Sequence, residues 1–380
     1  LKAGFDARSL RAEYDYFGTD HIYYVLEDGT YELERIDTVQ SYLEPSGNQF
    51  GAYLSNRIQV ADPLTLEVGA RYDRHSYTDD EKVSPRVNVA LKAGEYTTLR
   101  AGWGHFYQAQ RIDELMVGDD LTDFYPAERA EHRTIGLEHD FETGIRMRLE
   151  GYYKKYTDLR PEGRNTFDGL HAFPEFEDDR IIVYRDQSVA KGFEVFLKRE
   201  KGSKFTWWAS YAYARIDDKI NHVWYRNISG PDGMDVVYND TYPNPFDQRH
   251  TLYLDLSYRP TLKWQFNLAW HYHSGWPYTG IEVQSAVIDD ETVYWLNQGE
   301  LLAERYPAYQ RLDLRVNRYF DFWGGRLTAF VEVINVLGRE NVRGYEYELV
   351  GSGGSVWVEQ DVEPAFPRLP ILGITYSLNM

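Results

Sequence analysis

The sequence of 380 residues has no cysteine, only four methionines, and fewer basic than acidic residues. The absence of cysteine excludes disulfides, thiolate metal sites and cysteine nucleophiles. A net charge of −19 disfavours nucleic acid as a partner, because its phosphates would repel the chain. No run of about 18 apolar residues occurs, so a transmembrane helix is excluded. A membrane protein with this sequence would have to be a closed β-barrel.

Aromatic residues, by contrast, are plentiful. Tyr, Phe and Trp together make up 16% of the chain, with 32 Tyr and 10 Trp. A soluble protein with so many rings would normally bury them among aliphatic side chains. We therefore expect many of these rings to lie on the molecular surface.

The segment 262–273 alternates strictly between apolar and mostly polar side chains. One face carries Leu262, Trp264, Phe266, Leu268, Trp270 and Tyr272. A period of two indicates a β-strand with one apolar side. Aromatic residues near one end of that side, opposite a polar side, are typical of a barrel strand with lipid outside and water inside.

About fourteen segments of this kind are bounded by turn residues. They cover 1–16, 47–60, 64–77, 85–92, 97–107, 130–141, 144–159, 188–200, 204–217, 248–259, 262–275, 307–320, 325–338 and 368–380. Short connections lie at 61–63, 93–96, 142–143, 201–203, 260–261 and 321–324, and long ones at 17–46, 108–129, 160–187, 218–247, 276–306 and 339–367. This alternation predicts an all-β, antiparallel up-and-down transmembrane barrel, with short turns at one end and long loops at the other.

The phase of each strand predicts which side chains face lipid and which face an aqueous lumen. The predicted lumen residues include Arg146, Arg148, Glu150, Glu194, Lys198, Asp255, Arg311, Asp313 and Arg315. A basic residue on the lipid face at midplane would cost roughly 2–4 kcal/mol. A soluble propeller or carbohydrate-binding sandwich is the alternative fold. A propeller would show a repeat every 40–50 residues or so, and none is evident.

Four stretches share patterns with a known family. They are Val-Ser-Pro-Arg-Val-Asn-Val at 83–89 with the strand at 98–107, then 126–138, 329–341 and 370–378. Together they resemble the hairpin, strand-entry, penultimate-strand and closing-strand motifs of TonB-dependent outer-membrane receptors. The closing strand has an apolar face of Leu372, Ile374, Tyr376, Leu378 and Met380, although the family usually ends in an aromatic residue.

The resemblance implies a 22-stranded barrel with an N-terminal plug inside it. Residues 1–380 would then be the C-terminal portion of the barrel, without the plug domain. An open sheet cannot stay in hydrocarbon, since each bare N–H and C=O is costly there. The missing strands must come from upstream residues, or the fourteen must close on themselves. We favour upstream residues as the source, because Leu1 and the residues after it have the pattern of the middle of a strand.

No catalytic constellation is present, so we expect no enzyme activity. Loop aromatics are better candidates for ligand contact, because flat rings stack on sugars, chelators or peptides. The candidates are Phe124, Tyr125, Trp224, Tyr225, Trp276, Tyr278, Tyr294 and Trp295. The alternative is that these rings belong to an interfacial girdle. His271 and His273 share the lumen face and could bind a metal or metal chelate, or could simply be solvated wall.

Acidic pairs recur in the long loops. They are Asp119 and Asp120, Asp178 and Asp179, Asp217 and Asp218, and Asp289 and Asp290. Oxygen-rich loops can hold calcium, which takes about six to eight oxygen ligands. The EF-hand spacing is absent, so a hydrated acidic surface is the alternative. Calcium at Asp119, Asp120, Asp217 and Asp218 is therefore a weak prediction, and no cofactor is required.

The resemblance implies TonB-dependent active uptake of a scarce nutrient across the outer membrane. Siderophore, vitamin, peptide and glycan all stay open as the ligand, which the long loops and lumen wall would capture. The implied partners are the TonB complex, reached through the plug, and outer-membrane lipid with lipopolysaccharide. The long loops would be extracellular and the short turns periplasmic. The main alternative is a passive porin of about fourteen strands, whose lumen charges would set selectivity.

Overall fold

The computed structural model describes residues 1–26, 30–166, 180–200, 204–225, 234–288, 291–352 and 355–378. These residues form 24 β-strands and one short 3-10 helix, η1 (Val117–Asp119). Among them, no helix is long and apolar enough to cross a membrane. The structure is therefore almost entirely β, as the alternation predicted.

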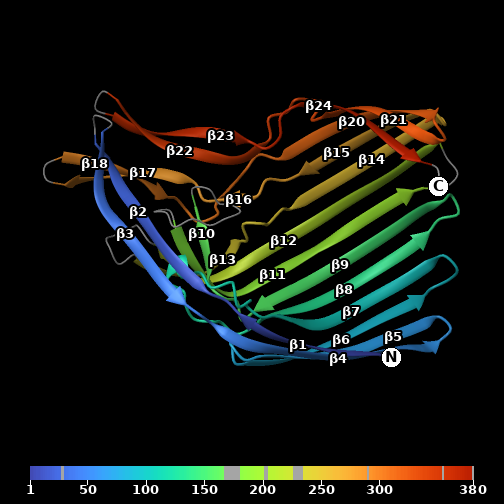
Figure 1. The fold of residues 1–380 in the computed structure, drawn as a ribbon, viewed down its shortest axis with the longest axis horizontal. Helices are drawn as coiled ribbons and strands as arrows, with labels where there is room; N and C mark the ends of the chain where they lie inside the picture. Colours follow the sequence, from blue (N-terminus) through green and yellow to red (C-terminus); the bar gives the residue numbers. More distant parts are fainter. Residues whose placement is uncertain are drawn as a thin grey trace.

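One large antiparallel sheet dominates the molecule (Figure 1), and a path of fourteen strands crosses it. In order along the sheet these are β1 (Lys2–Arg11), β4 (Ser46–Ala61), β5 (Leu64–His75), β6 (Asp80–Lys92), β7 (Thr97–Gln108), β8 (Glu128–Asp140), β9 (Ile145–Thr157), β11 (Arg180–Arg199), β12 (Phe205–Tyr225), β14 (His250–Thr261), β15 (Trp264–His273), β20 (Tyr309–Phe322), β21 (Gly325–Ile334) and β24 (Leu369–Leu378). From β4 to β24 the path follows chain order. The predicted up-and-down arrangement of about fourteen strands is confirmed.

Each predicted segment overlaps one of these strands, but several predicted boundaries are wrong. Segment 1–16 is not one strand, because β1 ends at Arg11 and a separate strand begins at Tyr14. Strand β6 begins at Asp80 rather than at residue 85. Strands β11 and β12 extend past their predicted ends at 188 and 217, because there they pair with each other in a folded region beyond the sheet body.

Most connections predicted as long loops contain strands of their own. β10 (Glu162–Asn165) pairs with β11, and β13 (Met234–Pro243) pairs with β12. Two small sheets are formed by β16 (Pro277–Tyr278) with β19 (Glu304–Arg305), and by β22 (Val342–Ser352) with β23 (Ser355–Pro364). A third has the order β17 (Ile281–Ile288), β18 (Glu291–Gln298), β2 (Tyr14–Leu26) and β3 (Tyr31–Leu43). These elements gather at the left of Figure 1, which we call the long-loop end.

The short turns lie at the opposite end of the sheet, at the right of Figure 1. Gly144 and Gly324 have φ angles of +78° and +71°, a conformation that costs glycine little. The Gly144 N–H donates to the Phe141 carbonyl at 2.9 Å, which closes the turn between β8 and β9. The predicted turn at 201–203 lies outside the described residues. The described turns confirm that one end of the sheet has short connections.

Strand register separates an apolar face from a polar one. Leu137, Leu149, Val195, Tyr211 and Leu252 pair in one row across five strands. On the other face, Lys198, Trp208, Asp255, Ala269 and Asp313 pair in one row. The predicted inward and outward phases are confirmed by this pairing. Trp208 is an aromatic exception on the polar face.

The apolar face is uncovered. Ile135 is 69% exposed and Leu372 is 78% exposed, and many other large apolar side chains on this face are also open to the surroundings. A continuous exposed apolar surface of this extent marks a membrane or partner contact in a folded protein. The sheet path ends at β1 and β24, and no pairing joins these two strands within the described residues.

The packed hydrophobic core lies at the long-loop end and not in the sheet body. Its buried members are Ile181, Val183, Ile220, Val223, Tyr225, Leu301 and Leu302. They come from the extensions of β11 and β12 and from the connection after β18. The alternating apolar residues of these extensions face inward together, which explains why strands continue beyond the sheet body.

Candidate functional site

A hollow of about 310 Å³ opens on the sheet near the long-loop end. It lies where β6 leaves β7, since the last pair between these strands is Arg86 with Gly104. The next residue toward the long-loop end is Pro85, which has no N–H for a ladder bond. Basic and imidazole side chains are frequent in the lining, and include Arg71, His75, Lys82, Arg86, His105 and Arg111.

Most cations of this hollow already have anionic partners. Arg71 contacts Asp73 and Asp6 at 2.7 and 3.1 Å, and Lys82 contacts Asp80 at 3.0 Å. Arg86 differs, because its buried Nε has no acceptor within the described part of the chain. The buried Nδ1 of His75 likewise lacks a partner there. Arg86 is thus a guanidinium with free donor capacity on the wall of the hollow.

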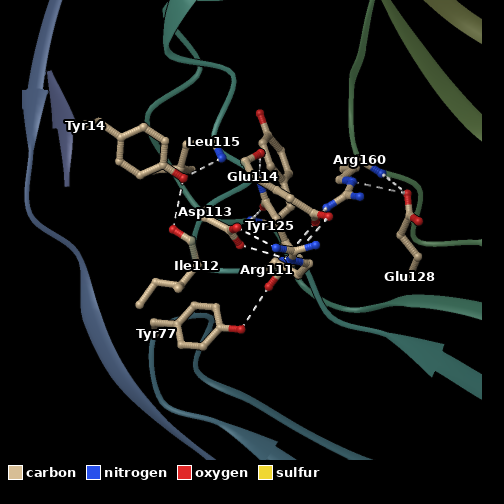
Figure 2. A network of polar contacts seen from close by, with 11 residues as sticks. Tyr14, Tyr77, Arg111, Ile112, Asp113, Glu114, Leu115, Tyr125, Glu128 and Arg160 are labelled. Carbon is tan, nitrogen blue, oxygen red and sulfur yellow. Dashed lines mark hydrogen bonds and ion pairs between the residues drawn. The ribbon is translucent and has the colours of Figure 1, made fainter. Parts of the chain in front are cut away.

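The connection between β7 and β8, residues 109–127, folds compactly beside this hollow (Figure 2). The Tyr14 hydroxyl donates to the Ile112 carbonyl and accepts from the Leu115 N–H, each at 2.9 Å. Burial raises the pKa of Tyr14, so its hydroxyl stays a neutral donor at physiological pH. A residue from the connection between β1 and β4 therefore holds the connection between β7 and β8 in place.

Tyr77 joins the connection after β5 to the same folded loop (Figure 2). The Tyr77 hydroxyl donates to the Gln110 carbonyl at 2.9 Å. The buried Gln110 side chain donates to the Glu114 carbonyl and accepts from the Tyr125 N–H, each at 3.0 Å. Buried amides of this kind constrain a loop strongly, because an unpaired polar atom there would cost about 1–3 kcal/mol.

Ion pairs complete the loop network. Arg111 forms a two-pronged contact with Asp113, and its backbone N–H donates to the Glu114 carboxylate at 2.9 Å. Arg160, which follows β9, reaches the same Glu114 carboxylate at 3.1 Å, and its N–H donates to Glu128. Figure 2 shows these side chains converging from different segments. The loop is thereby fixed as one wall of the long-loop end.

A second cluster of charges lies between β10, β11 and β12. Glu162 contacts Arg164 at 2.9 Å and Arg185 at 2.8 Å, while Asp218 lies 3.7 Å from both guanidinium groups. Burial alone would raise the pKa of Glu162, but Arg164 and Arg185 outweigh it and lower that pKa to about 2. The cluster carries two positive and two negative charges. These charges neutralise one another, so we assign the cluster a structural role.

Two buried carboxylates act as anchors in the same region. Asp119 of η1 accepts from Nε and Nη2 of Arg180 at 2.7 and 2.5 Å, and both side chains are almost fully buried. Asp247 is 0% exposed and accepts from Arg249 and Arg305 at 2.5 Å each. The contacts of Arg180 with Asp119 and of Arg305 with Asp247 link segments far apart in the sequence, which makes the long-loop end one folded unit.

Stacked tyrosines come together from β16, from β22 and from the residue after β19. Tyr278 stacks on Tyr306 with ring centres 4.4 Å apart, and its hydroxyl donates to Glu304 at 2.5 Å. Tyr345 lies 5.3 Å from Tyr306. Burial, with the nearby Glu304 charge, raises the pKa of the neighbouring Tyr347 to about 12. This cluster presents several flat rings beside one carboxylate.

The predicted aromatic residues do not converge on one point. Phe124 packs edge-on against Tyr77 at 5.1 Å, beside the hollow. Tyr125 is partly buried in the folded loop, and burial raises its pKa. Trp224 is half-buried in the extension of β12. Tyr225 belongs to the hydrophobic core, and its hydroxyl forms a hydrogen bond with the Tyr238 hydroxyl.

The remaining predicted aromatic and histidine residues lie near the tyrosine cluster or on the wall. His273 stacks on Tyr309 at 4.7 Å and lies 5.1 Å from Trp276. His271 lies on the polar face, edge-on to Tyr253. Tyr278 is part of the stacked cluster. Tyr294 and Trp295 are half-buried in β18.

The acidic pairs proposed for calcium have different surroundings. Asp119 is held by Arg180, Asp218 faces Arg164 and Arg185, and Asp217 pairs with Arg215 at 2.6 Å, while Asp120 is exposed. No group of three or more histidines or carboxylates in the described ranges could hold a metal ion. Asp178, Asp179, Asp289, Asp290 and Met380 lie outside the described residues. Calcium at these pairs stays a prediction.

Sequence reasoning missed two parts of this site. Tyr345 and Tyr347 alternate with Glu346 and Glu348, which is a strand signal inside a stretch interpreted as a loop. Arg86 was recognised only as part of a family motif and not as a candidate ligand contact. Arg86 is a candidate ligand contact only because β6 separates from β7 beside it and opens the hollow. No local sequence pattern predicts this separation.

An antiparallel sheet with one exposed apolar face, one polar face and all long connections at one end defines the wall of a transmembrane β-barrel. The family model "TonB dependent receptor-like, beta-barrel" matches residues 2–336. The chain therefore belongs to the TonB-dependent receptor-like β-barrel family, whose members are outer-membrane receptors and not enzymes. The resemblance inferred from the sequence is confirmed.

Solved structures share this fold at low sequence identity. The siderophore receptor PiuA from Acinetobacter baumannii is 12% identical with a TM-score of 0.60, over 98% of this chain and 52% of that one. The ferripyoverdine receptor of the outer membrane of Pseudomonas aeruginosa is 14% identical with a TM-score of 0.52, over 98% and 48%. A ferric enterobactin receptor (PfeA) mutant from Pseudomonas aeruginosa is 14% identical with a TM-score of 0.52, over 80% and 41%.

This chain thus spans about half or less of the length of these receptors. At such identities the likeness concerns the fold alone. No curated protein matches the sequence.

Proposed function

We propose that this chain forms part of the barrel of a receptor that takes up a scarce nutrient across the outer membrane, with energy supplied through TonB. The long-loop end faces the outside and the short turns face the periplasm. Family membership and the exposed apolar face support this location. Loops held by buried ion pairs suit an end that must keep its shape in water.

The observation that carries the proposal is the hollow beside Arg86. It opens near the long-loop end, and a folded loop forms one of its sides. Arg86 has an unsatisfied buried donor there, so it favours a ligand with a carboxylate, phenolate or similar anionic group. Siderophore complexes commonly carry such groups, and we place this class first. Vitamin, peptide and glycan ligands are the alternatives.

The free edges of β1 and β24 favour a larger barrel over a passive porin of fourteen strands. Each unpaired N–H or C=O in hydrocarbon costs several kcal/mol, so both edges need partner strands. Further strands of a longer protein would supply them. A plug inside that barrel would carry the contact with TonB, and ligand binding would shift the plug between states.

Nutrient accumulation tests the proposal. Cells expressing the full-length protein would be supplied with labelled ferric siderophores, cobalamin, peptides and oligosaccharides, with and without TonB. We expect at least one ligand to accumulate only when TonB is present. Accumulation that is equal in both strains would support the passive porin and contradict active uptake.

The absence of cysteine in this chain allows a direct test of orientation. Asp120→Cys places a thiol at the long-loop end, and Thr143→Cys places one in the turn between β8 and β9. A membrane-impermeant maleimide on intact cells should label the first position and not the second. The reverse pattern would contradict the proposed orientation.

A further inference from the structure

Arg318 lies on the apolar face and has no anionic partner among the described residues. This residue of β20 contacts two rings, with its guanidinium carbon 4.6 Å from the ring centre of Trp264 and 5.4 Å from that of Phe320. Within the described residues, no ion pair or hydrogen bond involves its side chain. Its pairing with Trp264 places it on the apolar face, in phase with Leu314 and Val316.

Arg318 lies at the short-turn edge of that face. Its partner Trp264 is the first residue of β15, and the neighbouring Tyr319 N–H donates to the Lys263 carbonyl in the turn. Exposed aromatic side chains surround this level of the sheet. They are Phe205, Tyr258, Trp264, Phe266, Phe320, Phe322 and Trp323, with exposures from 38% to 85%. Such a belt marks the depth of lipid headgroups.

A bare guanidinium facing hydrocarbon is costly, but the cost falls close to zero near the interface. Cation–π contact with these two rings holds the guanidinium, and its N–H groups form no hydrogen bond within the described residues. The fork of an arginine matches phosphate oxygens in a two-pronged contact. The position, the missing carboxylate and the free donors therefore all point to an anion supplied by the membrane.

We propose that Arg318, with Trp264 and Phe320, binds the phosphate of a membrane phospholipid whose chains lie on the exposed apolar face. The occupant is a phospholipid rather than free phosphate, because the exposed side chains around Arg318 are aromatic and aliphatic and can also hold the lipid chains. The inference rests on the proposed membrane location and is independent of the transported ligand.

The chain offers a matched control. Arg326 of β21 lies at the same short-turn end, with its guanidinium 5.3 Å from the ring centre of Tyr319. It pairs with Asp321 and Ser377, on the polar face of the sheet. Arg318 and Arg326 thus have the same charge and the same kind of ring contact, but face lipid and water respectively.

Native mass spectrometry of the full-length protein in detergent tests the site. Phosphatidylglycerol and a diacylglycerol with the same chains would be added to wild type, Arg318→Gln and Arg326→Gln. We expect wild type and Arg326→Gln to retain phosphatidylglycerol equally, and Arg318→Gln to retain about tenfold less, which corresponds to about 1.4 kcal/mol. Retention of the diacylglycerol should be low and the same in all three.

Equal phosphatidylglycerol retention by wild type and Arg318→Gln would overturn the proposal, as would an equal loss in both variants. Displacement of the lipid by inorganic phosphate would also overturn it, because the site would then be a free-anion site. Arg318→Lys should retain an intermediate amount, since the charge is kept and the fork is lost. If uptake fails but lipid retention depends on Arg318, the lipid site stands and the transport proposal falls.

Discussion

The sheet body and the long-loop end are stabilised in different ways. In the sheet body, large apolar side chains such as Ile135 and Leu372 are mostly exposed, and strand pairing is the main internal contact. At the long-loop end, Ile181 and Val183 are 1% and 0% exposed within a packed core. The sheet body depends on the membrane to cover its apolar face, whereas the long-loop end is packed like a soluble protein.

Ion pairs show the same contrast. Arg146 and Asp140 contact each other near the short turns with side chains 58% and 53% exposed. Arg180 and Asp119 form a similar contact with exposures of 5% and 4%. Exposed pairs contribute little because water screens them, while a buried pair cannot lose one member cheaply. The comparison therefore predicts that the long-loop end is the more sensitive to loss of single charges.

The largest effect is expected when the buried pair is broken. Arg180→Ala leaves the Asp119 carboxylate buried without its partner, which should cost about 3–5 kcal/mol of local stability. Hydrogen exchange of residues 109–127 and 180–187 would measure it as faster opening. Arg146→Ala is the control and should change stability by less than about 1 kcal/mol. Similar costs for both variants would contradict the distinction between the two ends.

A charge on the apolar face should have the next largest effect. Leu254→Arg puts a guanidinium in the row with Ala209 and Trp270, at a cost of roughly 2–4 kcal/mol near the bilayer centre. Tyr253→Arg places the same charge one residue away on the polar face, and should be tolerated much better. Urea titration of folding into lipid vesicles would compare them. Equal destabilisation would mean that the faces are not lipid and water.

Ligand binding should distinguish between two of the hollows on the polar face. Arg86→Gln removes the unpaired guanidinium, and should weaken binding of an anionic ligand about tenfold, or ~1.4 kcal/mol. Arg57→Gln is the control, because Arg57 lines a hollow of about 330 Å³ nearer the short turns. Titration of full-length protein with the ligand found in the uptake assay measures both. A larger loss for Arg57→Gln would place the ligand in the other hollow.

Acid should loosen the long-loop end before the sheet body. The pKa of Glu162 is about 2 in the folded protein, below its ordinary value of 4.5. Its stabilising contribution is thus full above pH 4.5 and is lost as pH falls from there toward 2. A third of the side chain is exposed, so screening limits the effect to on the order of 1 kcal/mol.

Hydrogen exchange of residues 160–166, corrected for intrinsic rates, would follow this loss with pH. Glu162→Gln should already be weakened at neutral pH and should lose the acid dependence in that range. Glu138→Gln, in the exposed contact with Arg100 near the short turns, is the control and should leave the loop unchanged. Unaltered acid dependence in Glu162→Gln would show that another group is responsible.

Much of the sheet could be predicted because its information is local. The alternation in 262–273 defines β15 and its two faces, since successive side chains of a strand point to opposite sides. The hairpins inside the long connections were predicted as loops, although Tyr345, Tyr347 and Leu349 alternate with glutamates. Composition alone did not separate a strand in water from a strand in lipid.

The candidate site was less predictable, because it depends on contacts between distant segments. Tyr225 and Trp224 are neighbours in sequence, yet Tyr225 is core and Trp224 is only half-buried. Arg86 is one of many arginines in the chain, and only the structure shows that its buried Nε lacks an acceptor beside a hollow, within the described residues. Which residues pair is a property of the fold and not of the residue type.

The sequence by itself determined the path of fourteen strands through the main sheet, the phase of its faces and the family. These follow from a two-residue period and the spacing of turns, both of which act over short range. Only the tertiary structure decided which charges are neutralised, where the hollow beside Arg86 opens and that Arg318 is left among rings facing lipid. The physical reason is that Coulomb and packing energies depend on distances between segments that strand register and loop folding bring together.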